Sequence, residues 1–326
     1  MKALGELIMA TKQLTFWLTA LLVTSFFSVA GQSKFIAVTI DDLPTVTYGK
    51  VDSTYHQLII SNLIEALKEY QVPGIGFVNE VKLYKGEKPI TYQTNLLKDW
   101  MTSGFALVNH TFSHADYNEM SMHAFAAEIL QGEKITREIV GAAGKKLTYF
   151  RHPYLHTGNT KARSDSLEAF LRTHTYQVAP VTIDNEDYLF AAAYQPARDN
   201  SDLMLTTDII QDYIKYMEAK LVYFERQSVR LFGRNINQVL LIHANRLNAD
   251  CLGALAQMYR RHGYEFVTLE KALTDPAYTT PVTAFGKWGI SWIDRWAMSQ
   301  GKSKDFFAGE PETPAYIKTL AAGIPK

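Results

Sequence analysis

Short runs of β-branched and aromatic residues alternate along this chain with longer amphipathic segments, and this alternation constrains the fold more than any other feature. We predict strands at 35–40, 74–79, 105–109, 147–150, 177–183, 238–242 and 265–269. Helices are predicted between them at 55–70, 94–101, 123–140, 166–174, 206–227 and 251–262, because apolar residues recur there with a helical period. Strand and helix repeated about seven times predict an α/β fold whose parallel sheet closes into a distorted (β/α)7-type barrel. A doubly wound open sheet is the alternative fold.

The first 30 residues have the pattern of an export signal. Lys2 and Lys12 precede an apolar run, and the small-residue triplet 28–30 that follows it is typical of a cleavage site. We predict a signal peptide over 1–30 and an exported protein that begins near Gly31, in the periplasm or outside the cell. An uncleaved membrane anchor is the less favoured alternative, because the run is shorter than the about 20 residues that span a bilayer.

The charge balance and cysteine content narrow the class of protein further. Removing residues 1–30 takes away two of 33 basic and one of 33 acidic residues, which leaves 31 and 32. This balance argues against nucleic acid as a partner and favours a neutral substrate. Cys251 is the single cysteine, so no internal disulfide can form and an exported protein must rely on its core.

Polar side chains suited to catalysis follow five of the predicted strands. They are Asp41 and Asp42, His110 and His114, Arg151, Asp184 and Asp187, and His243. Because the carboxyl ends of parallel strands form one face, we expect these side chains to converge there. If His110 and His114 lie one helical turn apart, they can grip one metal ion. Taken alone, the histidine pair also fits a surface or hydrogen-bonded pair, and adjacent aspartates also fit a turn or a helix cap.

Five short blocks give this set a family resemblance. They are VTIDDLP, HTFSH, RHPY, DNEDY and LIH, each after its predicted strand and in this order. Over residues 35–269 the ordered set resembles the NodB-like polysaccharide deacetylases of carbohydrate esterase family four. The resemblance implies a barrel of the NodB homology class and a metal-dependent hydrolase that releases acetate from N-acetyl groups of a polysaccharide.

The resemblance also implies which residues bind the metal and activate water. Asp42, His110 and His114 are implied as the ligands of a divalent metal, for which zinc is the first candidate and cobalt the second. Three such ligands leave coordination positions open, as catalytic zinc requires. Asp41 is implied as the general base and Arg151 as the residue that orients it.

Further roles are implied on the substrate side of the site. Asp187 is implied as the acid that holds Arg151, and His243, on the opposite side of the barrel mouth, as the general acid. Tyr154 would bind the oxyanion through its backbone, Leu241 would line the acetyl pocket, and Tyr188 replaces a usual tryptophan of the substrate wall. Leu43 and Pro44 replace a usual glycine, so the loop after the aspartate pair must take a different course.

Two regions lie outside these blocks. The connection from Glu186 to Thr206 is predicted as a long loop that forms a binding wall. After the catalytic domain, 31–275, an aromatic-rich C-terminal extension, 276–326, places Trp288, Trp292 and Trp296 at i, i+4 and i+8. We favour packing of this stripe on the barrel over stacking on sugar rings. The remaining histidines, His56, His123, His156, His174 and His262, match no block and are predicted to be structural or exposed.

The expected function is N-deacetylation of an N-acetylglucosamine glycan, with peptidoglycan, chitin-like polymers and exopolysaccharide left open as substrates. In one alternative, the same catalytic residues hydrolyse O-acetyl esters of xylan. Another is a carbohydrate-binding protein that has lost catalysis. We expect an acetylated polysaccharide as partner, without nucleic acid and without stable membrane insertion after processing.

Overall fold

The computed structural model describes residues 33–49 and 51–324, so the predicted signal peptide lies outside the described residues. Contacts divide the chain into residues 1–33 and residues 34–326, and the description below concerns the second unit. Its strands are β1 (Lys34–Val46), β2 (Ile75–Val78), β3 (Tyr84–Lys85), β4 (Lys88–Pro89), β5 (Ala106–Asn109), β6 (Tyr149–Phe150), β7 (Gln177–Val178), β8 (Gln238–Asn245) and β9 (Tyr264–Phe266). Its α-helices are α2 (Ser53–Glu69), α3 (Thr91–Thr102), α4 (Met122–Gln131), α5 (Lys134–Ala142), α6 (Lys161–Thr173), α7 (Asp187–Asp199), α8 (Leu203–Phe232), α9 (Arg246–Arg261), α10 (Leu269–Ala272), α11 (Trp292–Ser299) and α12 (Ala315–Ala322). Short 3-10 helices are η1 (Glu80–Leu83), η2 (Pro153–Leu155), η3 (Pro276–Thr279) and η4 (Lys304–Phe306).

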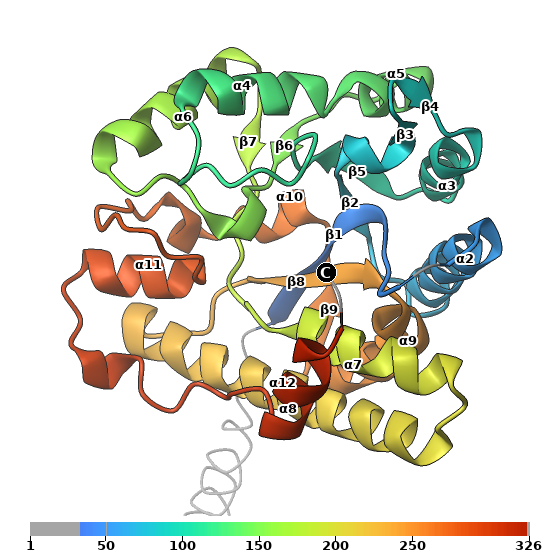
Figure 1. The fold of residues 1–326 in the computed structure, drawn as a ribbon. Coiled ribbons are helices and arrows are strands. Elements are labelled where there is room, and N and C mark those ends of the chain that lie inside the picture. Colours follow the sequence, from blue (N-terminus) through green and yellow to red (C-terminus); the bar gives the residue numbers. More distant parts are fainter. Residues whose placement is uncertain (1–32, 50, 325–326) are drawn as a thin grey trace, which may run out of the picture. The chain divides into compact units, whose positions relative to one another are not determined.

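Seven strands form one parallel sheet around β1 (Figure 1). The order is β7-β6-β5-β2-β1-β8, and β9 also pairs with β1. Each of the seven predicted strands overlaps one of these, although the predictions at 177–183 and 265–269 extend beyond β7 and β9. Ile183, which follows β7, forms a parallel bridge with Leu240 of β8, so the chain that leaves one end of the sheet reaches the strand at the other end. The predicted α/β fold with a curled parallel sheet is confirmed, and the small β3-β4 hairpin is an addition that the sequence pattern did not indicate.

Alternation along β1 decides which side chains face the site. The isoleucine and valine side chains of this strand join the large core under the helices, whereas Ala37 joins a smaller core with Phe77, Val239 and residues of α10. Because strand side chains alternate with a period of two, Thr39 and Asp41 share the face of Ala37. The hydrophobic pattern of the strand therefore fixes the direction of Asp41.

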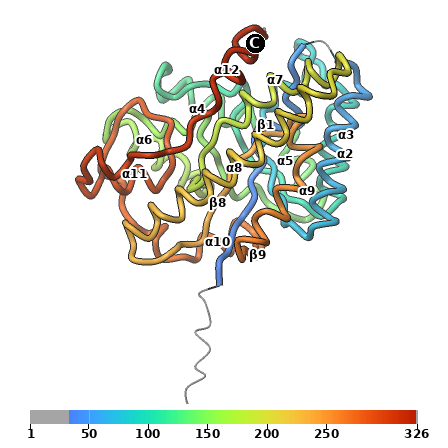
Figure 2. Tube along the Cα trace, turned by 90° about the horizontal axis from the view of Figure 1, so that it is seen from below, coloured from blue at the N-terminus to red at the C-terminus, as the bar shows by residue number. Residues whose placement is uncertain are grey.

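Helices cover the outside of the sheet in contacting groups. Helix α2 packs on α3 and α9, and α7 packs on α8, α9 and α12. Figures 1 and 2 both show α12, near the C-terminus, beside α7. The longest of them, α8, begins where the Asp202 side chain accepts a hydrogen bond from the Leu205 N–H and ends at Gly233, whose φ of 72° favours glycine. Within the described part of the chain, no helix is long and apolar enough to cross a membrane.

The connection predicted as a loop between Glu186 and Thr206 is largely helical, and this prediction is wrong. Helix α7 occupies Asp187–Asp199, and its alanines, Phe190 and Tyr194 are buried. Pro196 lies inside the helix, and the polar run that follows it is typical of a loop, which hid the helical period. Burial of α7 against α8 and α9 compensates for the low helix propensity of this sequence, so most of the segment packs in the core.

The tryptophan stripe of the extension is only partly helical. Helix α11 begins at Trp292, so Trp288 precedes it and is 36% exposed. Trp292 and Trp296 are buried, and the Trp296 ring lies 5.5 Å from the ring of Phe232 and 5.6 Å from that of Tyr278. Two of the three tryptophans are therefore buried and one is partly exposed. The boundaries at 31, 275 and 276 stay predictions.

Candidate active site

Asp41 and Asp42 lie near the carboxyl end of β1, where the strand is irregular. The pairing register shifts between Ile40 and Leu43, and Asp42 has a φ of 67°. This positive φ breaks the alternation, so the two neighbouring carboxylates need not point to opposite faces. The chain then continues as strand, and Leu43 is fully buried against Gly76, where any side chain would clash with it. The course of this segment thus differs from a flexible glycine turn, as predicted.

His110 and His114 approach each other without a helical turn, which corrects the premise of the sequence prediction. They follow β5 in an irregular segment with positive φ at Thr111 and His114. The Asn109 side chain accepts a hydrogen bond from the Thr111 N–H at 2.8 Å, which stabilises the turn. As a result, the ring centroids of the two histidines lie 4.9 Å apart.

Asp42, His110 and His114 form a group suited to a metal ion. Each offers a ligand atom, and these atoms lie within 4.8 Å of one another. Asp42 Oδ1 lies 3.5 Å from His110 Nε2 and 3.6 Å from His114 Nε2. Two ligands about 2.1 Å from one ion in tetrahedral geometry lie about 3.4 Å apart. The observed separations are close to that value.

The protonation of these groups also fits a metal. His110 Nδ1 donates to the Arg151 carbonyl at 2.8 Å, so the Nε2 of the neutral ring carries no proton. Burial lowers the pKa of both histidines. Although burial opposes ionisation, the nearby charge of Lys82 holds the pKa of Asp42 well below its usual range. Among the described residues, Asp42 Oδ1 is buried and has no hydrogen-bond partner. This is expected of an oxygen that binds a cation.

Asp41 and Arg151 form a buried ion pair beside this group. Arg151 Nη1 lies 3.3 Å from Asp41 Oδ2, and Nη2 donates to Thr39 Oγ1 at 2.9 Å. The guanidinium also lies over the Phe77 ring, 4.5 Å from its centroid. Burial raises the pKa of Asp41 to about 6, against the opposing charge of Arg151. Asp41 Oδ1 has no hydrogen-bond partner in the described structure, so this oxygen is available to accept a proton.

His243 is the residue opposite Asp41 on the neighbouring strand β8, rather than across the barrel mouth. Its Nδ1 donates to Asp187 Oδ1 at 2.6 Å, and its backbone N–H donates to Asp187 Oδ2 at 2.9 Å. Burial would lower the pKa of His243, but the charge and hydrogen bond of Asp187 prevail and raise it to about 9. The imidazole is therefore a proton donor at neutral pH.

The position of Asp187 corrects another sequence prediction. Its carboxylate binds His243 and also accepts from Asn248 Nδ2 at 2.6 Å and Asn245 Nδ2 at 3.2 Å. Arg151 instead pairs with Asp41. The first residue of α7 therefore positions the histidine and not the arginine.

The predicted substrate residues lie around these groups with different exposures. Tyr154 is 55% exposed, and its ring lies 4.5 Å from that of His114. Tyr188 is 44% exposed, and its ring lies 6.3 Å from that of His243. Leu241 is buried on β8. The two tyrosines are thus exposed next to the metal-ligand group and the candidate acid, respectively.

Several supporting residues were not predicted. Lys82 Nζ donates to the Asp42 carbonyl at 2.7 Å, and Asn79 Nδ2 donates to the His110 carbonyl at 2.5 Å. Thr39, Asn245 and Asn248 support the base and the acid as described above. The only sequence signal for them is their position next to a block or at a strand end.

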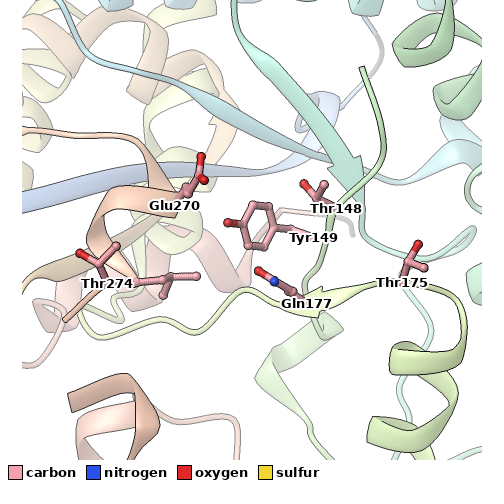
Figure 3. Close-up of a pocket in the computed structure, with 7 residues that line it drawn as sticks. Thr148, Tyr149, Thr175, Gln177, Glu270 and Thr274 are labelled. Carbon is pink, nitrogen blue, oxygen red and sulfur yellow. The ribbon is translucent and has the colours of Figure 1, made fainter. Parts of the chain in front are cut away.

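The amino ends of the strands lie away from the candidate active site and border a separate cavity. A cavity of about 400 Å³ lies beside β6, β7 and α10 (Figure 3). It is lined by Thr148, Tyr149, Thr175, Gln177, Glu270, Leu273 and Thr274. Since Arg151 follows the carboxyl end of β6, this cavity lies at the other end of the strands and contains none of the predicted site residues.

Comparison with known proteins finds similarity over the first half of the chain. Residues 28–179 match the family model described as polysaccharide deacetylase. A chitin deacetylase from Arthroderma benhamiae is 27% identical over 153 residues, which are 47% of this chain and 35% of that protein. The chain thus spans about a third of that relative's length. These matches confirm the resemblance to the NodB-like polysaccharide deacetylases over the matched residues.

Solved structures of similar chains include two from bacteria. A family 4 carbohydrate esterase from Streptomyces lividans, in complex with acetate, is 18% identical with a TM-score of 0.45, covering 73% of this chain and 95% of that chain. A CE4 family pseudoenzyme from Bacillus anthracis is 14% identical with a TM-score of 0.48, covering 74% of this chain and 66% of that chain.

Proposed function

We propose that this protein is an exported, metal-dependent polysaccharide deacetylase that hydrolyses N-acetyl groups of an N-acetylglucosamine glycan. One observation carries the proposal. A buried carboxylate, Asp41, lies between the metal-ligand group and a protonated histidine, His243. Amide hydrolysis needs these three functions together, because water must be activated and the leaving nitrogen must gain a proton.

The ligand group fits zinc, with cobalt as a second candidate. Zinc held by Asp42, His110 and His114 would supply Lewis-acid polarisation of the acetyl carbonyl and of the attacking water. Asp41 would accept the proton of that water, and Arg151 would keep its carboxylate oriented and ionised. The backbone of Tyr154 would stabilise the developing oxyanion. Leu241 would line the pocket of the acetyl methyl group, and Tyr188 would form part of the sugar-binding wall.

His243 distinguishes amide from ester hydrolysis. An amine anion is a poor leaving group, so an amide needs a proton donor at the nitrogen, whereas an alkoxide depends on it less. The Asp187–His243 pair supplies a donor that is charged at neutral pH. This supports the N-acetyl substrate over an O-acetyl ester of xylan, and the complete set of groups supports an active enzyme over an inactive binding protein.

Acetate release from a substrate panel tests the reaction. The panel contains an N-acetylglucosamine oligomer, peptidoglycan, an acetylated exopolysaccharide and acetylated xylan, each with zinc-loaded and chelated protein. We expect zinc-dependent acetate from at least one N-acetylated glycan. Release from xylan alone would make the protein an esterase, and release from none would refute the proposal.

Export is tested separately. The apolar run and the small residues at 28–30 support cleavage before Gly31. N-terminal sequencing of protein from the extracytoplasmic fraction should therefore begin near Gly31. Recovery of Met1 or Met9 in the membrane pellet would refute cleavage.

A further inference from the structure

A second cavity, of about 550 Å³, lies between the segment before α7, helix α8 and the C-terminal extension. It is lined by Asp184, Asn185, Glu186, Lys220, Gly289, Ile290, Asp294, Phe307, Gly309, Glu310, Pro311, Glu312 and Lys318. Its volume lies in the range of small-ligand sites, about 300–1,000 Å³. Residues from the segment before α7, from α8 and from the extension thus enclose one space, for which the proposed reaction has no use.

Negative charge exceeds positive charge in this cavity. Five carboxylates and two lysines line it. Lys220 Nζ pairs with Glu310 at 2.5 Å, and Lys318 Nζ pairs with Glu312 at 3.3 Å. Both lysines are therefore paired, and neither forms an ion pair with Asp184, Glu186 or Asp294.

Asp294 is the strongest indication of a ligand. Its side chain is 7% exposed, and among the described residues its buried Oδ1 has no hydrogen-bond partner. Burial, together with the charges of Glu310 and Asp184, raises its pKa to about 7. A buried carboxyl without a partner is costly unless something supplies a donor. Because Asp294 lines the cavity, a ligand there can supply that donor.

The spacing of these acids favours an organic cation over a metal ion. In the described part of the chain, only Asp42, His110 and His114 bring three such ligand atoms within 4.8 Å of one another. No three acids of the cavity therefore bring their ligand atoms that close to one another. A protonated amine on a sugar ring fits better, because it carries three donors and the ring fills the remaining volume.

The cavity adjoins the candidate active site through residues 184–187. The Asn185 side chain donates to the Leu241 carbonyl at 2.6 Å, and Glu186 directly precedes Asp187. Burial lowers the pKa of Arg151, and the charges of Asp41 and Asp184 both oppose that shift, so Asp184 acts on the candidate site. A sugar in the cavity would thus lie close to a sugar whose acetyl group is at the site.

We propose that this cavity binds the protonated amine of a glucosamine unit, so that the enzyme favours glycan chains that already carry a deacetylated sugar. The inference rests on the proposed function for its substrate class. It gives the C-terminal extension a role in selecting substrate, because Asp294 and Phe307 to Lys318 belong to that extension. The product of one turnover would then promote binding for a further turnover on the same chain.

Direct binding tests this proposal with two matched sugars. A β-1,4-linked glucosamine tetramer and cellotetraose share linkage and ring size but differ in the amine. Calorimetry at neutral pH should show that the protein binds the glucosamine tetramer on the order of tenfold more tightly. Equal affinity for the two tetramers would overturn the proposal, and so would calcium binding in the cavity without any preference for the amine.

Charge-neutralising variants test whether the acids of the cavity cause the preference for the glucosamine tetramer. Asp294→Asn should abolish the preference, whereas Asp208→Asn should retain it, because Asp208 is exposed on α8 about 18 Å along the helix from Lys220. Asp184→Asn supplies the same test if Asp294→Asn does not fold by circular dichroism. An undiminished preference in the folded variant would overturn the assignment. The glucosamine tetramer carries no acetyl group, so a failure of the proposed deacetylation leaves this result intact, and the reverse also holds.

Discussion

Residues 34–179 and residues 180–324 contribute different parts of the candidate site and depend on different kinds of structure. The first region carries Asp41, Asp42, the histidine pair and Arg151, each at a strand end. The second carries His243, held by Asp187 in α7, and the Asp187 carboxylate accepts from asparagines at the start of α9. The metal-ligand group thus forms from short motifs, whereas the acid depends on contacts among three elements. Only the first region falls within the family match.

Burial determines the pKa shift in the first region, whereas a neighbouring charge determines it in the second. In the first, it raises the pKa of Asp41 to about 6 even though Arg151 opposes it, which makes the carboxylate a stronger base. In the second, the Asp187 charge outweighs burial and raises the pKa of His243 to about 9. In the proposed reaction one region would accept a proton and the other would donate one, so substitutions in each should differ in their effects.

The largest effect is expected from His110→Ala in the first region. It removes one of three ligands, and loss of a residue that merely supports a ligand already costs about 10- to 100-fold in metal affinity. We expect zinc binding, measured by equilibrium dialysis, to weaken by more than that and acetate release to vanish. His123→Ala, an exposed histidine on α4, should match the wild type. Unchanged zinc affinity in His110→Ala would show that the ligands are wrongly assigned.

Asp41→Asn should retain zinc but lose turnover. The amide keeps the shape of the carboxylate but cannot accept a proton, and removal of a general base costs about 10²- to 10⁴-fold. Steady-state acetate release, with metal content measured on the same sample, checks this, and Asp165→Asn on the exposed face of α6 is the matched control. Activity within a few fold of the wild type would place the base elsewhere.

His243→Ala tests the second region by the choice of substrate. Loss of the proton donor should reduce turnover of an N-acetylglucosamine oligomer on the order of 10²-fold and largely spare an aryl acetate, whose leaving group needs no proton. His262→Ala, which removes a histidine paired with Glu218 far from the site, should leave both rates unchanged. Equal losses on both substrates in folded, zinc-loaded His243→Ala would exclude the acid role.

Asp187→Asn should produce the smallest change, seen mainly in the pH profile. The donor is protonated below its pKa, so N-deacetylation should fall as the pH rises through about 9 in the wild type. Without the Asp187 charge the pKa of His243 falls, and the alkaline limb should move to lower pH. Rates from pH 6 to 10 measure the shift. An unmoved limb would mean that another group donates the proton.

The sequence predicted the first region better than the second for physical reasons. The strands carry strong β-branched patterns, and the aspartate and histidine motifs directly follow them, so the parallel sheet brings Asp42 and His110 to the same edge. The turn geometry of the histidines was missed because it depends on Asn109 and on positive φ angles that spacing does not reveal.

In the second region, the contacts that position His243 join residues that are distant in sequence. Asp187 lies 56 residues before His243, and a helix with an internal proline carries it, so neither α7 nor the Asp187–His243 pair was predicted. The acidic cavity was missed for the same reason, since Asp184 and Asp294 are brought together only by the packing of α11. Sequence motifs identify side chains that lie at the ends of neighbouring strands. They do not identify side chains that are brought together by the packing of helices.

Titration of metal-free protein with zinc tests the central claim most directly, with bound zinc and acetate release from an N-acetylglucosamine oligomer measured in the same samples. The structure has one group of three suitable ligands among its described residues, so acetate release should rise in proportion to bound zinc and level off at about one equivalent. Full activity in the metal-free protein, or one bound zinc without acetate release from any N-acetylated glycan, would contradict the account.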